Sequence, residues 1–119
     1  MPAGQRSSTP TLHREIWQAA TAYIDGRLAH GLTVEHVARA ALTSERQLQR
    51  IFAAEGVTVR SYIAQARMRR AAELALGTDA LVVDIAGHVG YAHASAFIKA
   101  FRSFHGMTPS ELRRRHRRM

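Results

Sequence analysis

One apolar pattern occurs twice in this chain, and it constrains the possible folds more than any other feature. The two copies are Val37, Ala38, Leu42, Leu48 and Phe52, and then Ile85, Ala86, Gly90, Phe97 and Phe101. The first members lie 48 residues apart and the last members 49 apart, so the second copy has one additional residue in its turn. Each copy is typical of a short apolar helix, a tight turn and a longer amphipathic helix.

A single unit of this kind is a weak signal, because any helical hairpin can produce it. Two units joined by another amphipathic helix are typical of proteins that reach two neighbouring segments of one DNA duplex. The connecting helix, expected over residues 58–76, would be about 28 Å long, close to the roughly 34 Å rise of one DNA turn. The repeat therefore favours a function in binding duplex DNA.

Length and composition restrict the class of protein. The chain has 119 residues, enough for one domain with a modest core, and 46% of them are hydrophobic. No apolar run approaches the roughly 20 residues of a membrane span, and the N-terminal stretch lacks the apolar segment of a secretory signal. The absence of Cys excludes disulfides, thiol nucleophiles and thiolate metal sites. We therefore expect a cytoplasmic protein without a membrane partner.

The chain is strongly basic. Lys and Arg total 17 against 9 acidic residues, for a formal net charge of +8, and Lys99 is the only lysine. Because Arg pairs bidentately with phosphate and guanine, this composition favours a nucleic-acid partner. Residues 113–119 are expected to form a basic tail, and without its five arginines the net charge falls to +3. The charge thus supports a nucleic-acid partner but does not establish one.

Helical periodicity and turn residues predict an all-α fold of seven helices. Residues 1–11 are expected to form a flexible leader or linker stub, and residues 12–116 the folded domain. Within the domain, one helix-turn-helix subdomain is expected over about 33–55 and the other over about 80–105, joined by the helix at 58–76. The helices are expected over residues 12–29, 33–41, 44–55, 58–76, from about 79 to the turn at 90, 93–104 and from 108 onward.

Capping residues support several of these boundaries. Thr33 and Thr58 are good N-caps, and Ser44 with Gln47 forms a capping box before the third helix. Thr108 and Glu111 form a second box around a Pro at the first helical position. The spacing also predicts that Leu48, Phe52, Phe97 and Phe101 are core residues and that Trp17 and Tyr23 pack the first helix onto the domain.

The stretch from Leu28 to Arg114 closely resembles the DNA-binding domain of the AraC/XylS family of bacterial transcription regulators. The matching runs are 32–38, 44–52, 62–63, 67–68, 84–86, 89–91, 97–101 and 106–109, about three quarters of the chain from end to end. The resemblance implies two helix-turn-helix units in one monomer, each with its second helix in the major groove, on one face of the DNA. It also implies RNA polymerase as a partner and a role in transcription regulation, as an activator or as a repressor.

Three residues depart from the family pattern. Leu42 stands where the turn of the first unit usually has Gly, so either Leu42 is strained at a positive φ or the turn has a different geometry. Lys99 stands where the family usually has Arg, which keeps the charge but loses the bidentate fork. Leu112 replaces an aromatic residue, which is a variation in packing.

The candidate DNA-binding residues lie on the second helix of each unit. They are Ser44, Arg46, Gln47, Gln49, Arg50, His93, Ala94, Ser95, Ile98 and Lys99. The residues between 44 and 50 are rich in hydrogen-bond donors. The residues between 93 and 99 instead offer a hydroxyl, an ammonium group and apolar surface for a thymine methyl. We therefore expect the first unit to supply more base readout and the second to anchor phosphates, with His93 at a helix N-terminus.

Other classes of function have less support. The chain shows no nucleophile–base or carboxylate pair for an enzyme, and DNA-repair methyltransferases with this kind of domain need a Cys. The His residues are scattered, so we expect no metal and no cofactor. A basic helical module that binds RNA or the ribosome remains the alternative, since it explains the charge but not the duplicated unit.

Two expectations concern assembly. No heptad pattern remains for a zipper, so the isolated domain is expected to be monomeric. The chain contains no effector-sensing domain, and its leader resembles an interdomain linker, which favours the C-terminal part of a longer regulator over a stand-alone one.

Overall fold

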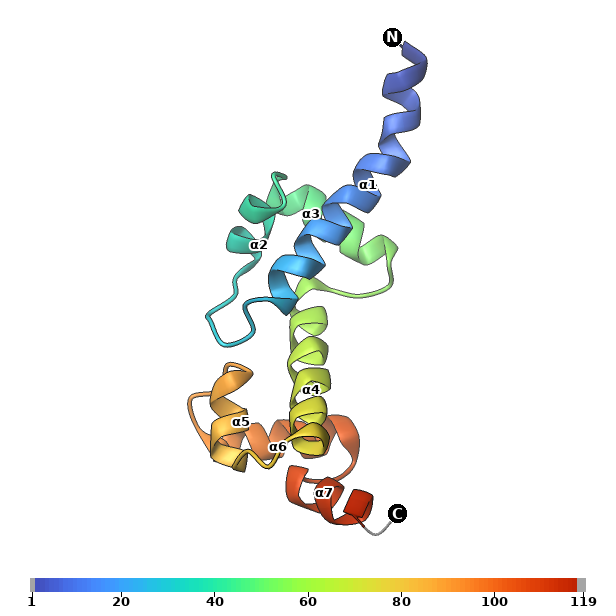
Figure 1. Cartoon of the computed structure of the whole chain (residues 1–119). Helices are drawn as coiled ribbons and strands as arrows, with labels where there is room; N and C mark the ends of the chain where they lie inside the picture. The colour runs from blue at the N-terminus through green and yellow to red at the C-terminus, as the bar shows by residue number, and fades with distance from the viewer. Residues whose placement is uncertain (1, 118–119) are drawn as a thin grey trace. The chain divides into compact units, whose positions relative to one another are not determined.

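The computed structural model describes the backbone of residues 2–117 and the side chains of residues 11–117. Every regular element in that range is an α-helix (Figure 1). In chain order the helices are α1 (Pro2–Asp25), α2 (Val34–Ala40), α3 (Glu45–Ala54), α4 (Val59–Gly77), α5 (Val82–His88), α6 (Ala94–His105) and α7 (Pro109–Arg117). The predicted all-α class is therefore confirmed over the described residues. None of these helices is both long and apolar enough to cross a membrane.

The helices form two compact units. Unit 1 comprises the residues up to Arg27 together with Leu32–Tyr62, and so contains α1, α2, α3 and the first turn of α4. Unit 2 comprises Leu28–Gly31 and the residues from Ile63 onward, and so contains the rest of α4 with α5, α6 and α7. The helix expected to link the two subdomains is present as one continuous helix, α4, whose first turn belongs to unit 1 and whose remainder belongs to unit 2.

Unit 1 is built on α1. Both α2 and α3 pack against this helix (Figure 1). Trp17 lies 4.6 Å from Phe52 and 5.7 Å from Tyr62 between ring centroids, so it packs α1 onto the unit as predicted. The buried apolar side chains of this unit are Ile16, Ala20, Ile24, Val37, Ala38, Ala41, Leu48, Ile51, Phe52 and Val59.

Unit 2 has its own apolar core. The core comprises Met68, Ala71, Ala75, Ile85, Ala86, Val89, Phe97 and Phe101. Ring contacts extend through it from Tyr91 to Phe97 at 5.6 Å, from Phe97 to Phe101 at 5.7 Å, and from Phe101 to His105 at 4.3 Å. The repeated positions behave alike in both units, since the side chains of Leu48, Phe52, Phe97 and Phe101 are all fully buried.

The two turns of the repeat share a left-handed backbone but not a residue type. Gly90 has a φ of 95°, which costs a glycine little. Leu42 holds the equivalent position with a φ of 57°, and its side chain is 92% exposed. The strained alternative for Leu42 is therefore correct, and no burial of the side chain offsets the strain.

Most predicted caps are formed. The hydroxyl oxygens of Thr33, Ser44 and Thr58 accept hydrogen bonds from backbone N–H groups three residues later, at 3.0–3.1 Å. The box at α7 is reciprocal: Thr108 N–H donates to Glu111 Oε1 at 2.8 Å, and Glu111 N–H donates to Thr108 Oγ1 at 3.1 Å. These bonds pair N–H groups that helix starts otherwise leave without partners.

The start of α5 differs from the prediction. The helix begins at Val82 rather than near Asp79. Thr78 at the end of α4 accepts the Ala80 N–H at 3.2 Å and donates to the Leu74 carbonyl at 2.6 Å. Because these side-chain bonds form a local turn, the backbone of residues 78–81 does not enter a helix.

The start of the expected domain also differs from the prediction, whereas its last helix begins where it was expected. The leader predicted for residues 1–11 is helical from Pro2, because Pro suits the first helical position and each added residue extends α1 by one hydrogen bond. The predicted basic tail is helical through Arg117, because the capping box starts α7 just before it. Met1 and residues 118–119 lie outside the described residues.

The first helix ends earlier than expected, at Asp25 rather than about Ala29. A tight turn follows, in which Arg27 N–H donates to the Ile24 carbonyl at 3.0 Å. Leu28 is then buried, and the segment Leu28–Gly31 belongs to unit 2. The chain therefore passes from unit 1 to unit 2 directly after this turn.

Candidate nucleic-acid interface

The outer face of α3 presents a stripe of polar donors. Leu48, Ile51 and Phe52 are buried on one side of the helix. Arg46, Gln49 and Arg50 are exposed on the opposite side, at the three- and four-residue spacing that aligns side chains along a helix. We call these three residues the α3 stripe. Two guanidinium groups and one amide on a single face provide the donors and acceptors that read base edges in a major groove.

The other two predicted residues of α3 lie at the edge of this face. Ser44 is exposed, and its oxygen accepts the Gln47 N–H at 3.1 Å. The hydroxyl proton of Ser44 is not used in that bond and remains available as a donor. Gln47 is half-buried between the core and the stripe. Ser44 therefore acts first as a helix cap.

The corresponding face of α6 is less uniform. Ser95 and Lys99 are exposed, as predicted for a contact surface. Ile98 is half-buried and packs against the core of unit 2. Its methyl groups are therefore partly committed to packing, and the apolar surface expected to meet a thymine methyl is reduced.

Arg102 extends the α6 face by one turn, and the sequence analysis did not select it. It is exposed and borders one groove together with Ser95, Ile98 and Lys99. The sequence could have identified it, because Arg102 follows Lys99 by three residues and so lies on the same face of the helix. The equivalent position in the first copy is Ala53. We call Ser95, Lys99 and Arg102 the α6 stripe. Its two cations suit phosphate contacts.

The start of α6 has no side-chain cap. His93 occupies the N-cap position, is exposed, and forms no capping hydrogen bond. The predicted contact residue Ala94 follows it and is half-buried. The first N–H groups of α6 therefore have no side-chain acceptor from the N-cap residue. In α2 and α3, by contrast, Thr33 and Ser44 each accept one N–H. Free N–H groups at a helix start favour an anion.

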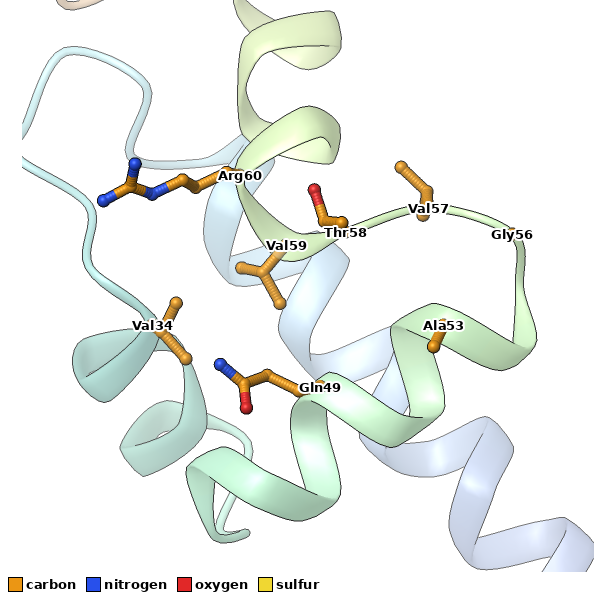
Figure 2. A pocket seen from close by; sticks show the side chains of 8 residues that line it. All are labelled: Val34, Gln49, Ala53, Gly56, Val57, Thr58, Val59 and Arg60. Carbon is orange, nitrogen blue, oxygen red and sulfur yellow. The ribbon is translucent and has the colours of Figure 1, made fainter.

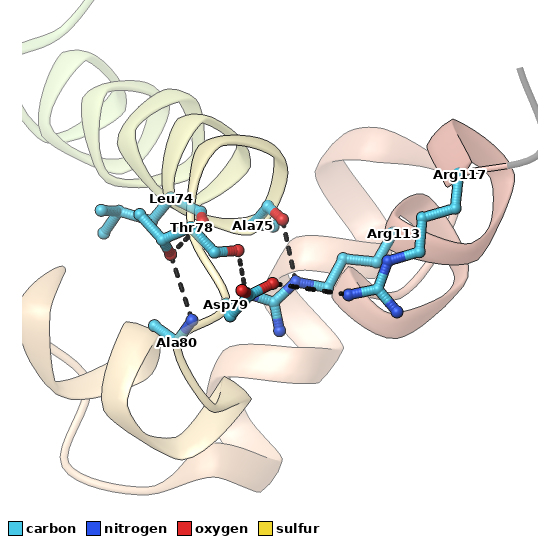
Figure 3. A network of polar contacts seen from close by, with 7 residues as sticks. All are labelled: Leu74, Ala75, Thr78, Asp79, Ala80, Arg113 and Arg117. Carbon is cyan, nitrogen blue, oxygen red and sulfur yellow. Dashed lines mark hydrogen bonds and ion pairs between the residues drawn. The ribbon is translucent and has the colours of Figure 1, made fainter.

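The C-terminal arginines have different roles. Arg113 Nε donates to the Ala75 carbonyl at 2.8 Å, and its Nη2 donates to the Thr78 carbonyl at 3.0 Å (Figure 3). Arg117 pairs with Asp79 at 3.7 Å. Arg114 and Arg115 are exposed beside Gly106 and Met107. The described part of the predicted basic tail, residues 113–117, thus contains structural and exposed cations on one helix.

Among the described residues, no three His, Asp or Glu side chains lie close enough together to hold a metal ion. Two of the His residues instead have structural partners. His105 Nε2 lies 3.0 Å from the Met68 carbonyl in unit 2. His13 Nε2 lies 3.1 Å from Glu55 Oε2 in unit 1. These contacts account for both imidazoles without a ligand.

Comparison with known proteins identifies the family. Residues 37–115 match the helix-turn-helix domain family, a span that includes both copies of the repeat. The transcriptional activator NphR of Rhodococcus is 36% identical over 88 residues, which cover 74% of this chain and 26% of that protein. The uncharacterized transcriptional regulator YijO of Escherichia coli is 31% identical over 114 residues, which cover 95% of this chain and 40% of that protein. The chain thus spans less than half the length of these relatives.

Solved structures share the fold. A DNA-binding transcriptional dual regulator of E. coli K-12 superposes with a TM-score of 0.81 at 27% identity, covering 88% of this chain and 95% of that one. The C-terminal domain of AraT, a response regulator from Geobacillus stearothermophilus, has a TM-score of 0.76 at 34% identity, covering 83% of this chain and 84% of that one. The chain belongs to the AraC/XylS family of transcription regulators and carries the family's DNA-binding domain with its two helix-turn-helix units.

Proposed function

We propose that this domain recognises a specific duplex DNA sequence by inserting α3 and α6 into successive major grooves, and that it regulates transcription from that site. The observation that carries the proposal is the α3 stripe, in which Arg46, Gln49 and Arg50 are exposed together on the face opposite the core. An Arg on such a face contacts guanine O6 and N7 together, and an amide contacts adenine N6 and N7.

The two helices contribute differently to this recognition. The α3 stripe has three side chains suited to base edges, and none of them is needed for packing. In the α6 stripe, Lys99 and Arg102 are suited to phosphates, while the neighbouring Ile98 is partly committed to the core. An α6 start with free N–H groups beside His93 adds a further anchor. Base readout is therefore concentrated on α3, and α6 supplies more of the sequence-independent affinity.

The domain acts as a monomer, is located in the cytoplasm at the nucleoid, contacts RNA polymerase when bound near a promoter, and activates transcription. It carries out no catalysis of its own. Relatives that are named transcriptional activators or regulators support the regulatory role, although one relative, AdaA of Bacillus subtilis, is named a bifunctional transcriptional activator and DNA repair enzyme.

The test uses a binding site selected from a random duplex pool. We expect Arg46→Ala and Arg50→Ala each to cost about 1–3 kcal/mol on the selected site and much less on random DNA. Arg114→Ala is the matched control. A phosphate contact carries no sequence information, so its loss should weaken binding to the selected site and to random DNA by similar factors. If both α3 variants keep the wild-type ratio of specific to random affinity, α3 is not the reading helix.

Two further measurements test the arrangement. Footprinting on the selected site should reveal a non-palindromic sequence that spans two adjacent major grooves about one turn apart. A strict inverted repeat bound by one chain contradicts this. Sedimentation at micromolar concentration should give a monomer. Duplex RNA of the same sequence should bind weakly, because its deep and narrow major groove does not admit a helix.

A further inference from the structure

A groove of about 570 Å³ lies in unit 1 beside the outer face of α3. Its apolar walls come from three helices and a loop: Val34 begins α2, Ala53 lies in the last turn of α3, Val57 precedes α4, and Val59 begins α4. Its polar groups include the Gln49 amide and the Arg60 guanidinium (Figure 2). A groove with apolar walls and a cation at its edge fits a ligand with one apolar and one anionic part.

This groove is continuous with the α3 stripe. Gln49 belongs to both, because it lies on the exposed face of α3 and also lines the groove. Ala53 continues the same face one turn beyond Gln49 and Arg50. Figure 2 shows the Gln49 side chain extending from α3 toward Val34 and Val59. Whatever lies along the α3 stripe therefore also passes the mouth of the groove.

The charge of the groove is positive and not neutralised locally. Arg60 is exposed, and among the described residues it takes part in none of the ion pairs. No acidic residue lines the groove. The neighbouring Thr58 hydroxyl is already engaged, since it accepts the Ser61 N–H at 3.0 Å. Arg60 is thus the cation available to an anionic ligand there.

We propose that this groove holds one deoxyribose-phosphate unit of the DNA backbone at the edge of the major groove occupied by α3. The phosphate pairs with the Arg60 guanidinium, and the sugar lies against the apolar wall of Val34, Ala53 and Val59. Arg60 is therefore a positioning residue that sets how far α3 enters the DNA major groove, while the α3 stripe reads the bases. This inference rests on the proposed function of α3 in DNA binding.

The test combines Arg60→Gln with chemically modified DNA. Neutral methylphosphonate linkages are placed one at a time along both strands of the selected site. One linkage is expected to weaken wild-type binding roughly tenfold, and Arg60→Gln, already weakened by a similar factor, should no longer respond to that linkage. The slope of the logarithm of the binding constant against the logarithm of the salt concentration is here called the salt slope. Arg60→Gln should lower its magnitude by about 1 while keeping the ratio of specific to random affinity, and Arg60→Lys should restore most of it.

Controls separate this contact from nonspecific charge effects. Arg39→Gln removes an exposed Arg of α2 that already pairs with Glu35 at 3.9 Å, and it should leave the response to every linkage unchanged. Ala53→Glu places a carboxylate in the groove and should weaken binding more than Ala53→Gln, which matches it in size. Circular dichroism confirms that each variant is folded.

Two failures are distinguishable. If Arg60→Gln keeps the salt slope and responds to every linkage as the wild type does, Arg60 binds no phosphate and this inference is wrong. The same holds if Ala53→Glu and Ala53→Gln weaken binding equally. These results leave the role of α3 untouched, because Arg46→Ala and Arg50→Ala test it separately through the specific-to-random ratio.

Discussion

Arg113 of α7 donates a hydrogen bond from Nε to the carbonyl oxygen of Ala75, at 2.8 Å, near the end of α4. The same guanidinium also donates to the Thr78 carbonyl at 3.0 Å (Figure 3). The last carbonyls of a helix have no partner within the helix, so a cation there both pairs them and complements the helix dipole. Arg113 therefore joins α7 to the C-terminus of α4.

The first prediction concerns this contact. Arg113→Ala should lower the free energy of unfolding by about 1–2 kcal/mol, because two charge-assisted hydrogen bonds at a half-buried site are lost. Arg113→Lys should be intermediate, since an ammonium group lacks the planar fork. Urea denaturation measures both, and Arg115→Ala on the exposed side of α7 is the control. Equal stability of Arg113→Ala and Arg115→Ala would show that the contact contributes nothing.

The strained turn of unit 1 gives a stabilising substitution. Leu42→Gly should raise the free energy of unfolding by roughly 0.5–1 kcal/mol, because the left-handed strain of a leucine exceeds the added entropy of an unfolded glycine. The Leu42 side chain is 92% exposed, so little packing is lost. Ala53→Gly, at an exposed helical position, should instead destabilise by about 1 kcal/mol. A destabilised Leu42→Gly variant in thermal denaturation would mean that the leucine has a compensating contact.

Gly90 and Gly56 make a matched pair that separates strain from crowding. Both have a positive φ, of 95° and 80°. A Cβ at Gly56 meets nothing within 4 Å, whereas a Cβ at Gly90 would collide with the Leu28 carbonyl oxygen and lie 3.0 Å from Arg67 Nε. Gly56→Ala should therefore cost about 1 kcal/mol from strain alone, and Gly90→Ala clearly more.

Urea denaturation of the two variants tests this difference. The contact at Gly90 lies in unit 2, where Arg67 Nη2 also donates to the His30 carbonyl at 3.2 Å. Displacing Leu28 or Arg67 would disturb that bond as well. Equal losses of stability in the two variants would show that the segment at Leu28 yields without cost.

The capping box of α7 predicts a dependence of stability on pH. The Thr108 backbone N–H, and then its hydroxyl, hold the pKa of Glu111 below its ordinary value of 4.5. Because the folded state binds this proton more weakly than the unfolded chain, the contribution is fully present above the ordinary pKa. It is lost as the pH falls through the lowered value. Wild type should therefore be more stable than Glu111→Gln near neutral pH, and the difference should shrink in acid.

Melting temperatures of both proteins across the acid range provide the measurement. The difference between them should be constant at neutral pH and should decline only below about the ordinary pKa of a glutamate. A difference that stays the same throughout the acid range would show that the Glu111 carboxylate is not stabilised by Thr108 in solution.

Sequence reasoning was most successful where the determining interactions are local. The caps at Thr33, Ser44, Thr58 and Thr108 each involve a hydroxyl and an N–H three residues away, so spacing alone predicts them. The burial of Leu48 and Phe52 follows from helical periodicity in the same way. The exposure of Arg46, Gln49 and Arg50 is the complement of that pattern. Whether these residues read bases remains a prediction.

It was less successful where distant segments compete for a residue. Ile98 has the spacing of an outward-facing residue, yet it packs partly against the core of unit 2. Arg113 stands among exposed arginines, and only the approach of α7 to the end of α4 separates its role from theirs. Arg60 was not among the predicted site residues, because only the packing of the start of α4 beside α3 brings it to the same groove as Gln49.

The sequence by itself therefore determined the helices, most of their caps, the duplicated unit and the outward face of α3, since all of these depend on spacing within one or two turns. Only the tertiary structure decided that the segment Leu28–Gly31 belongs to unit 2, where α4 divides between the units, and which C-terminal arginines are structural. The physical reason is that burial and hydrogen bonding between segments depend on atoms that are far apart in the chain, and these contacts override local preference.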